Sequence, residues 1–390
     1  MKKQIFISLF IATAITMLSM GIITPILPLY AKSMMATNIQ LGIIFSGFAL
    51  SRGIFAPIIG KYSDNYGRKN LIVFGLIIFI ILSVSFALAS SPFTLTIIRI
   101  VQGFSSILVT PVAQAYIGDI TPKGKEGNYM NLFFMSFFAG QAAGPYFGGY
   151  LTDQFNIRTP FYVMAILSLI ALILVLFLVP ESSAVKKDNN KDESILKSLF
   201  PVFKDKPMIG IMTYMSSRGF YRWGFNTFFP ILAVKTISMS ATNIGLVLSA
   251  YMISGSIIQY PFGLAVDRFP GQKLNLILIG GSVSAIAMII FTCYDSLIMY
   301  AFLTIIMGVF SSVSRASAVA IRTERGRVHG MGAVTGAFTS SLSFGQVLGP
   351  IVFGIIADLL NLPAAFIIGG VIGLIGTVAS YIFFKVDTDY

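Results

Sequence analysis

The sequence predicts an all-α integral membrane protein whose chain contains twelve transmembrane helices in two six-helix repeats. Three observations predict this class. First, 56% of the residues are hydrophobic, 11% are charged and the mean hydropathy is +0.84, which excludes an ordinary soluble domain. Second, apolar runs long enough to cross a bilayer as helices recur along the whole chain. Third, blocks of the first half of the sequence recur in the second half.

The apolar runs predict twelve spans. The first run follows Lys2 and Lys3 and continues to about Tyr30 without a small-residue cleavage pattern, so we interpret it as a helix and not as a signal peptide. Polar or charged loops bound the other runs. We expect the spans at residues 5–30, 41–60, 71–90, 93–117, 128–150, 159–179, 207–232, 243–264, 273–293, 296–320, 330–356 and 362–384.

Loop charges predict the orientation. The formal net charge of +12 could suggest a nucleic-acid partner, but most Lys and Arg residues fall in short loops on the face of the N-terminus. Lys32, Arg158 and Lys235 lie on the other face. By the positive-inside rule, both termini are expected in the cytoplasm. We therefore expect a multi-pass protein of the plasma membrane, surrounded by the lipid bilayer, with no nucleic acid as partner.

One long polar connection divides the chain. Residues 186–193 carry a run of charges typical of a solvated linker, and residues 194–200 have the pattern of a short amphipathic helix on the membrane surface. We expect an N-terminal six-helix bundle at 1–180, a cytoplasmic linker with the amphipathic helix at 181–206, and a C-terminal six-helix bundle at 207–390.

The two halves repeat each other. A first block recurs after 205 residues: Gly140–Pro145 with Gly149 and Asp153 matches Gly345–Pro350 with Gly354 and Asp358. A second block, from Gly42 to Asp64, matches Gly245 to Asp267 after 203 residues. Parallel repeats of this kind predict a binding cavity between the halves, near the bilayer midplane.

A charged loop separates the second and third expected spans. Its pattern is Gly60, three residues, Asp64, two residues, then Gly67, Arg68 and Lys69. The loop resembles the signature between the second and third helices of the major facilitator superfamily of secondary transporters. The resemblance implies the major facilitator fold, a small-molecule substrate and a monomer. It also implies a conformational latch, in which Asp64 faces the start of the span at 330–356; a plain surface turn is the alternative.

Two further motifs resemble the twelve-helix drug:proton antiporter branch. Small residues four apart allow close helix packing, and a proline allows a kink. In that branch such a motif lies at the interface of the halves, which implies a hinge there; generic packing is the alternative. The positions are Gly140, Gly144, Pro145 and Gly149, with the second copy at Gly345, Gly349 and Pro350. Arg99 and Gln102 resemble the branch's fourth-helix signature, which implies a role in coupling or in the cavity.

Five arginines fall inside the expected spans, whereas all fifteen acidic residues can be placed in loops or at helix ends. Each arginine would cost about 2.5–3.5 kcal/mol at mid-membrane, so we expect a function for them. Tyr214, Arg218, Arg222 and Asn226 recur every four residues and form one polar stripe. Together with Arg52, they are our candidates for binding a carboxylate, phosphate or sulfate group. Contacts to carbonyls or to Asp153 are the alternative, and for Arg315 snorkelling to the interface is favoured.

The resemblance implies secondary transport by alternating access, and the branch implies efflux. Unpaired arginines would repel a cation, so we expect export of a neutral or anionic amphipathic small molecule. Multidrug or cationic drug:proton antiport and anionic lipid transport are the alternatives, and proton coupling stays open. Cys293 and His329 are single, so we expect no metal site and no cofactor. No catalytic cluster falls at membrane depth, so we do not expect an enzyme.

Overall fold

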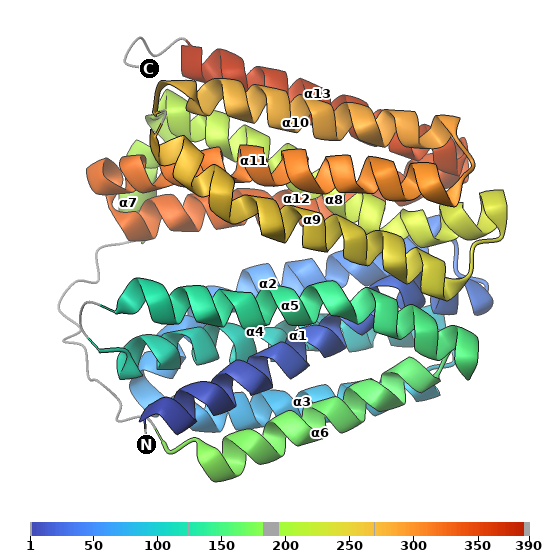
Figure 1. Cartoon of the computed structure of the whole chain (residues 1–390), viewed down its shortest axis with the longest axis horizontal. Coiled ribbons are helices and arrows are strands. Elements are labelled where there is room, and N and C mark those ends of the chain that lie inside the picture. The colour runs from blue at the N-terminus through green and yellow to red at the C-terminus, as the bar shows by residue number, and fades with distance from the viewer. Residues whose placement is uncertain (1, 123–124, 182–194, 269, 386–390) are drawn as a thin grey trace. The chain divides into compact units, whose positions relative to one another are not determined.

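The computed structural model describes residues 2–122, 125–181, 195–268 and 270–385, so half of the linker expected at 181–206 lies outside the described residues. The described chain is helical from end to end (Figure 1). The helices are α1 Lys2–Ser33, α2 Asn38–Tyr66, α3 Lys69–Leu88, α4 Pro92–Ile120, α5 Glu126–Gln154, α6 Thr159–Leu178, α7 Ile195–Lys204, α8 Lys206–Ile237, α9 Ala241–Arg268, α10 Lys273–Ile290, α11 Leu297–His329, α12 Met331–Leu359 and α13 Leu362–Lys385; short 3-10 turns cover Pro270–Gln272 and Phe291–Cys293.

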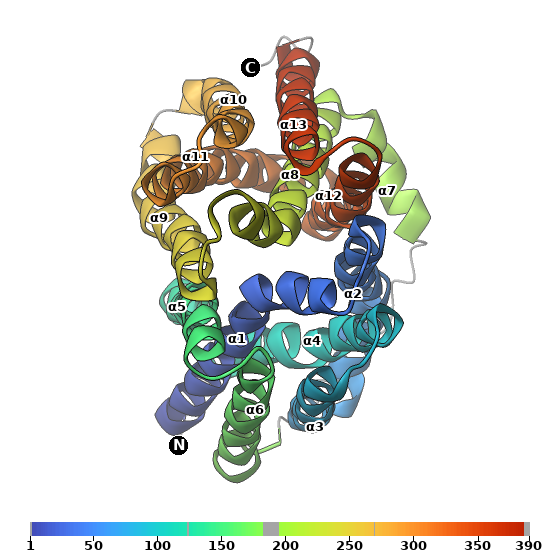
Figure 2. The same ribbon diagram turned by 90° about the vertical axis from the view of Figure 1, so that its right-hand side faces the viewer.

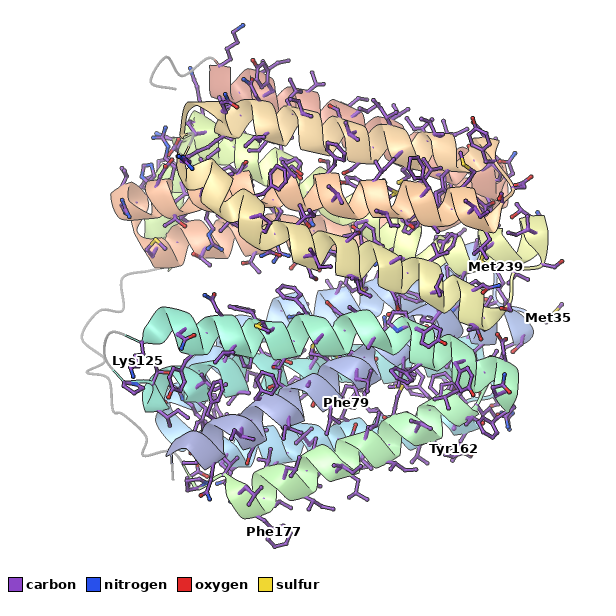
Figure 3. All side chains as sticks on the ribbon, viewed as in Figure 1. Met35, Phe79, Lys125, Tyr162, Phe177 and Met239 are labelled. Carbon is purple, nitrogen blue, oxygen red and sulfur yellow. The ribbon has the colours of Figure 1, made fainter. Side chains whose placement is uncertain are left out.

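Ten of the described helices are long and apolar enough to cross a membrane. Helices α5 and α8 are also long, 29 and 32 residues, but glycines and polar residues in α5 and the arginines of α8 lower their hydropathy. Apolar side chains cover the outer faces of the helices: Phe177 of α6 is 82% exposed and points away from the bundle, whereas Phe79 of α3 is buried (Figure 3). Such outward apolar faces fit a lipid environment.

The chain forms two compact units. Unit 1 comprises residues 1–36, 43–188 and 239–249. Within it α1 packs on α5 and α6, and α3 packs on α4 and α6. Its core contains Leu76 of α3, Val112 and Tyr116 of α4, and Val175 of α6.

Unit 2 comprises residues 37–42, 189–238 and 250–390. Here α8 packs on α12 and α13, and α10 packs on α11 and α13. The same pairs of helices therefore pack in both units, as the sequence repeat predicts. Each unit also includes one helix start from the other half of the sequence. The first turns of α9 belong to unit 1, and the start of α2 belongs to unit 2.

The repeated glycines mark the closest helix contacts inside each unit. A Cβ atom on Gly140 of α5 would lie 2.2 Å from the carbonyl oxygen of Ala14 in α1. In unit 2, a Cβ on Gly345 of α12 would lie 1.9 Å from the carbonyl oxygen of Ser216 in α8. Because no other residue fits such contacts, the glycines allow backbone to pack on backbone in both units.

The charged loop between α2 and α3 is shorter than expected. Helix α2 continues to Tyr66, so Gly60 and Asp64 are helical and not part of a turn. Only Gly67 and Arg68 separate the two helices, and Gly67 adopts a φ of +88° that favours glycine. The apolar run ends at Gly60, but backbone hydrogen bonding does not require apolar side chains, so the helix continues beyond the run.

Candidate functional site

The polar stripe of α8 faces the interior of unit 2. Tyr214 is fully buried and Arg218 is 3% exposed, whereas Arg222 and Asn226 are partly buried. The period of four residues places all four side chains along one face of the helix, spanning about three turns. The structure thus brings together the four α8 residues that the sequence predicts.

Neighbouring helices supply hydroxyl and aromatic partners. The Nε atom of Arg218 donates to Ser311 Oγ of α11 at 3.1 Å, and the Tyr214 hydroxyl hydrogen-bonds to Ser314 of the same helix. The guanidinium of Arg222 lies over the ring of Tyr251 in α9, 5.4 Å from its centroid. These partners are not among the residues that the sequence predicts for the site; the signal that could have found the serines is the serine-rich run just before Arg315.

Positive charge gathers in this cluster. Arg315 of α11 is close enough to Arg218 and Arg222 for their charges to repel one another. The groups whose charges act on these arginines are other arginines and tyrosines, with no carboxylate among the described residues. The Nε atom of Arg222 and Oδ1 of Asn226 are buried without a hydrogen-bond partner in the described part of the chain. The cluster, defined here as Tyr214, Arg218, Arg222, Asn226, Tyr251 and Arg315, offers charged donors to an anion.

The other two arginines of the spans lie in unit 1. Arg52 of α2 has an exposed side chain and does not belong to the unit 2 cluster. Arg99 of α4 is 5% exposed and donates to Gln102 Oε1 at 2.9 Å. Its guanidinium lies 4.8 and 4.7 Å from the ring centroids of Phe45 and Phe48 in α2. Arg99 is therefore packed between helices by cation–π contacts and one amide.

The residues of the latch motif contact the ends of α4 and α6. Arg68 forms an ion pair with Asp119 at 3.0 Å. Glu181 Oε1 accepts from the backbone N–H groups of Arg68 and Lys69 at 3.0 and 3.1 Å, and so caps the first turn of α3. Lys69 Nζ donates to the carbonyl oxygen of Leu176. The side chain of Asp64 lies outside the described residues.

The repeated aspartates each cap a helix start. Asp153, at the end of α5, accepts hydrogen bonds from the N–H groups of Ala241 and Thr242 at the start of α9. Asp358, at the end of α12, accepts from the N–H groups of Asn38 and Ile39 at the start of α2. Asp153 therefore does not serve as an ion-pair partner of the α8 arginines, because its oxygens bond to α9.

Beside each cap, backbone packs on backbone. A Cβ on Gly149 would lie 2.0 Å from the Ala241 carbonyl oxygen, and a Cβ on Gly354 would lie 2.4 Å from the Asn38 carbonyl oxygen. Gly149 and Pro145 of α5 thus contact the start of α9, as Gly354 and Pro350 of α12 contact the start of α2. These caps and glycine contacts explain why the start of α9 belongs to unit 1 and the start of α2 to unit 2.

Comparison with known proteins agrees with this architecture. The family model described as Major Facilitator Superfamily matches residues 9–235 and 215–390. An uncharacterized MFS-type transporter of Methanocaldococcus jannaschii is 30% identical, over 98% of this chain and 98% of its own. Multidrug resistance protein 2 of Bacillus subtilis is 26% identical, over 96% and 94%. The crystal structure of the nucleoside transporter NupG superposes with a TM-score of 0.83 at 16% identity, covering 98% of this chain and 99% of that one.

Proposed function

Because this chain belongs to the Major Facilitator Superfamily of membrane transporters, we propose that it is a secondary transporter of the plasma membrane that exports a neutral or anionic amphipathic small molecule by alternating access. The observation that carries the proposal is the charge of the unit 2 cluster. Arg218, Arg222 and Arg315 come together there, and the described residues add hydroxyl groups and aromatic rings but no carboxylate.

An anion fits this cluster for two reasons. Guanidinium groups outside bulk water bind carboxylate, sulfate and phosphate groups through charge-assisted hydrogen bonds. In addition, like charges held close together raise the free energy of the empty site, and an anion relieves that repulsion. The same positive charges would repel an organic cation.

The second candidate function is export of cationic drugs in exchange for protons. The similarity to Multidrug resistance protein 2 of Bacillus subtilis favours it. Such a carrier needs a group that releases a proton during the cycle, and a carboxylate in or near the membrane is the usual choice. In the unit 2 cluster the described residues offer none, so we favour the anion.

The test compares probes that share one tail. Purified protein is heated with decanesulfonate, decyl maltoside or decyltrimethylammonium, and the same probes are applied to Arg218→Gln and Arg222→Gln. A ligand at 100 times its dissociation constant stabilises by about 2.7 kcal/mol. We expect stabilisation of the wild type by the sulfonate and loss of this effect in both variants. Arg158→Gln, which removes an exposed arginine of unit 1, is the matched control and should respond like wild type.

The opposite result would select the second function. If only decyltrimethylammonium stabilises the wild type, export of a cation is favoured. If the Arg218 and Arg222 variants still respond to the sulfonate, the cluster does not bind the substrate. Uptake of the preferred probe into inside-out vesicles, with and without a proton gradient, then separates proton exchange from uncoupled transport.

A further inference from the structure

Unit 2 contains a cavity of about 390 Å³ between α9 and α11. The two helices lie side by side in both ribbon views (Figures 1 and 2). One wall is a face of α11 that runs from Arg315 through Val319 and Ala320 to Arg327, and α9 contributes Gln259 and Val266. Its size is within the range of small-molecule sites in proteins.

The cavity exists because α9 and α11 are in close contact at one end and separate toward the other. A Cβ on Gly308 of α11 would lie 2.4 Å from the carbonyl oxygen of Tyr251 in α9, and Gly255 is similarly close to Ser312. At Gly263, two turns further along α9, a Cβ would meet nothing within 4 Å. Alanines at 316 and 320 leave the widening gap unfilled.

Its charge is set by Arg315 near the closed end. Among the described residues Arg315 has neither a hydrogen-bond acceptor nor an ion-pair partner, and it is close to Arg218 and Arg222. At the other end Glu324 is paired with Lys273, and Arg327 adds a positive charge to the described residues that line the mouth. Arg315 and Arg327 are twelve positions apart, about 18 Å along the helix axis. From Ala316 to Ala320 this wall is apolar, and Thr323 and Glu324 follow toward the mouth.

We propose that this cavity is a binding site for an organic anion with an apolar body, and that it is the entry site from which the anion passes to Arg218 and Arg222. Arg315 binds the acid group, and the apolar body lies on Val319 and Ala320. The onward step rests on the proposed function, but binding in the cavity does not. The mouth lies toward His329 at the end of α11, on the face that the loop charges predict to be cytoplasmic.

Cysteine protection tests binding in the cavity directly. Ala320→Cys is made in a protein that carries Cys293→Ser, and its labelling by a maleimide is timed with decanesulfonate or decyl maltoside. At ten times its dissociation constant a ligand leaves about one site in eleven free, so labelling should slow about tenfold. The native Cys293 is exposed and remote from the cavity residues in sequence, so its labelling in the wild type should not change.

The lipid composition of the nanodisc distinguishes two possible sources of the anion, a free organic anion and a lipid headgroup. Protection by decanesulfonate in phosphatidylcholine nanodiscs supports the proposal with a free organic anion as ligand. Protection that requires phosphatidylglycerol in the nanodisc supports it with a lipid headgroup as ligand. Equal labelling rates with and without both anions would overturn it.

Substitutions in the cavity and in the central cluster test this proposal and the proposed function independently. Arg315→Gln and Ala320→Phe should each abolish the sulfonate-dependent thermal shift. Arg322→Gln is the control, because Arg322 is on the same helix but lies over the ring of Phe338 and outside the cavity. If Arg218→Gln loses the shift while Ala320→Phe keeps it, the entry site is wrong and the central cluster stands; Arg315 belongs to both sites, so Ala320→Phe is the variant that separates them. If Arg218→Gln keeps the shift while both cavity variants lose it, the cavity stands and the central cluster is wrong. If no variant loses it, both are wrong.

Discussion

The Oδ2 atom of Asp153 accepts hydrogen bonds from both the backbone N–H and the hydroxyl of Thr242, at 2.7 and 2.6 Å. This carboxylate therefore satisfies N–H groups in the first turn of α9 that have no partner inside the helix. Asp358 does the same for α2, with Asn38 Nδ2 as the additional donor at 2.7 Å. The two aspartates are equivalent positions of the sequence repeat, so the repeat preserves a helix cap in each unit.

Loss of either cap should destabilise its unit. We expect Asp153→Ala, Asp358→Ala and Thr242→Val each to cost about 1 kcal/mol, the usual value of a helix cap. The two aspartate variants should combine additively, because the caps share no partner. Thermal unfolding of the purified variants measures this. Thr339→Val is the control, since that hydroxyl bonds only to its own helix; unchanged melting of the aspartate variants would refute the role of the caps.

Acidification should weaken the Asp153 cap. Burial alone would raise the pKa of Asp153, but hydrogen bonds from Thr242, Ala241 and Ser240 outweigh it and hold the pKa below its ordinary value. A lowered pKa adds stability that is complete above the unfolded-state pKa of about 3.9 and is lost as the pH falls through the folded-state value. Melting temperatures from pH 7 down to 3 should therefore fall more for wild type than for Asp153→Asn. Parallel curves would show that the carboxylate does not titrate with folding.

Replacement of glycine by alanine should have opposite effects on stability at two positions of α12. Gly345→Ala places a methyl group against the Ser216 carbonyl and should destabilise by about 1–3 kcal/mol. Gly336→Ala, in the same helix, meets nothing within 4 Å and should be neutral or stabilise by up to about 1 kcal/mol through helix propensity. Melting of the two variants side by side tests the contact. Equal melting would mean that α8 and α12 can move apart at no cost.

Arg99 should be unnecessary for folding. Its buried guanidinium is held by Gln102 and two phenyl rings, without a carboxylate among those contacts. Replacement of a buried charge by an apolar residue of similar volume is often neutral or stabilising by up to about 4 kcal/mol. We expect Arg99→Met to melt no lower than wild type, while transport of the preferred probe into vesicles falls severalfold. A variant that melts normally and transports normally would show that Arg99 serves neither coupling nor the cavity.

Some of the site follows from sequence periodicity, and some requires the fold. The four-residue period of Tyr214, Arg218 and Arg222 fixes a common helix face, because side chains follow the helical repeat. The partner of Arg218 does not follow from the sequence. A serine in an apolar helix usually bonds to a carbonyl of its own preceding turn, as Ser314 does with Phe310, so the sequence cannot tell which serine is left for an arginine.

Helix ends are the second feature that the sequence pattern does not predict. The apolar run of α2 marks the membrane part of the helix, whereas the helix itself ends at Tyr66, just before Gly67 turns to positive φ. The cap partners are harder still. Asp153 and Thr242 are 89 residues apart, and only the folded arrangement shows that one carboxylate meets the start of another helix.

The exchange of helix starts has a consequence for reconstitution from fragments. Unit 1 needs residues 239–249 and unit 2 needs residues 37–42, which come from the opposite half of the sequence. A gene divided within residues 182–194 therefore yields two polypeptides, and each lacks the helix start that its own aspartate caps and its own glycines contact. Complementation between them would be required for either polypeptide to regain a complete set of contacts.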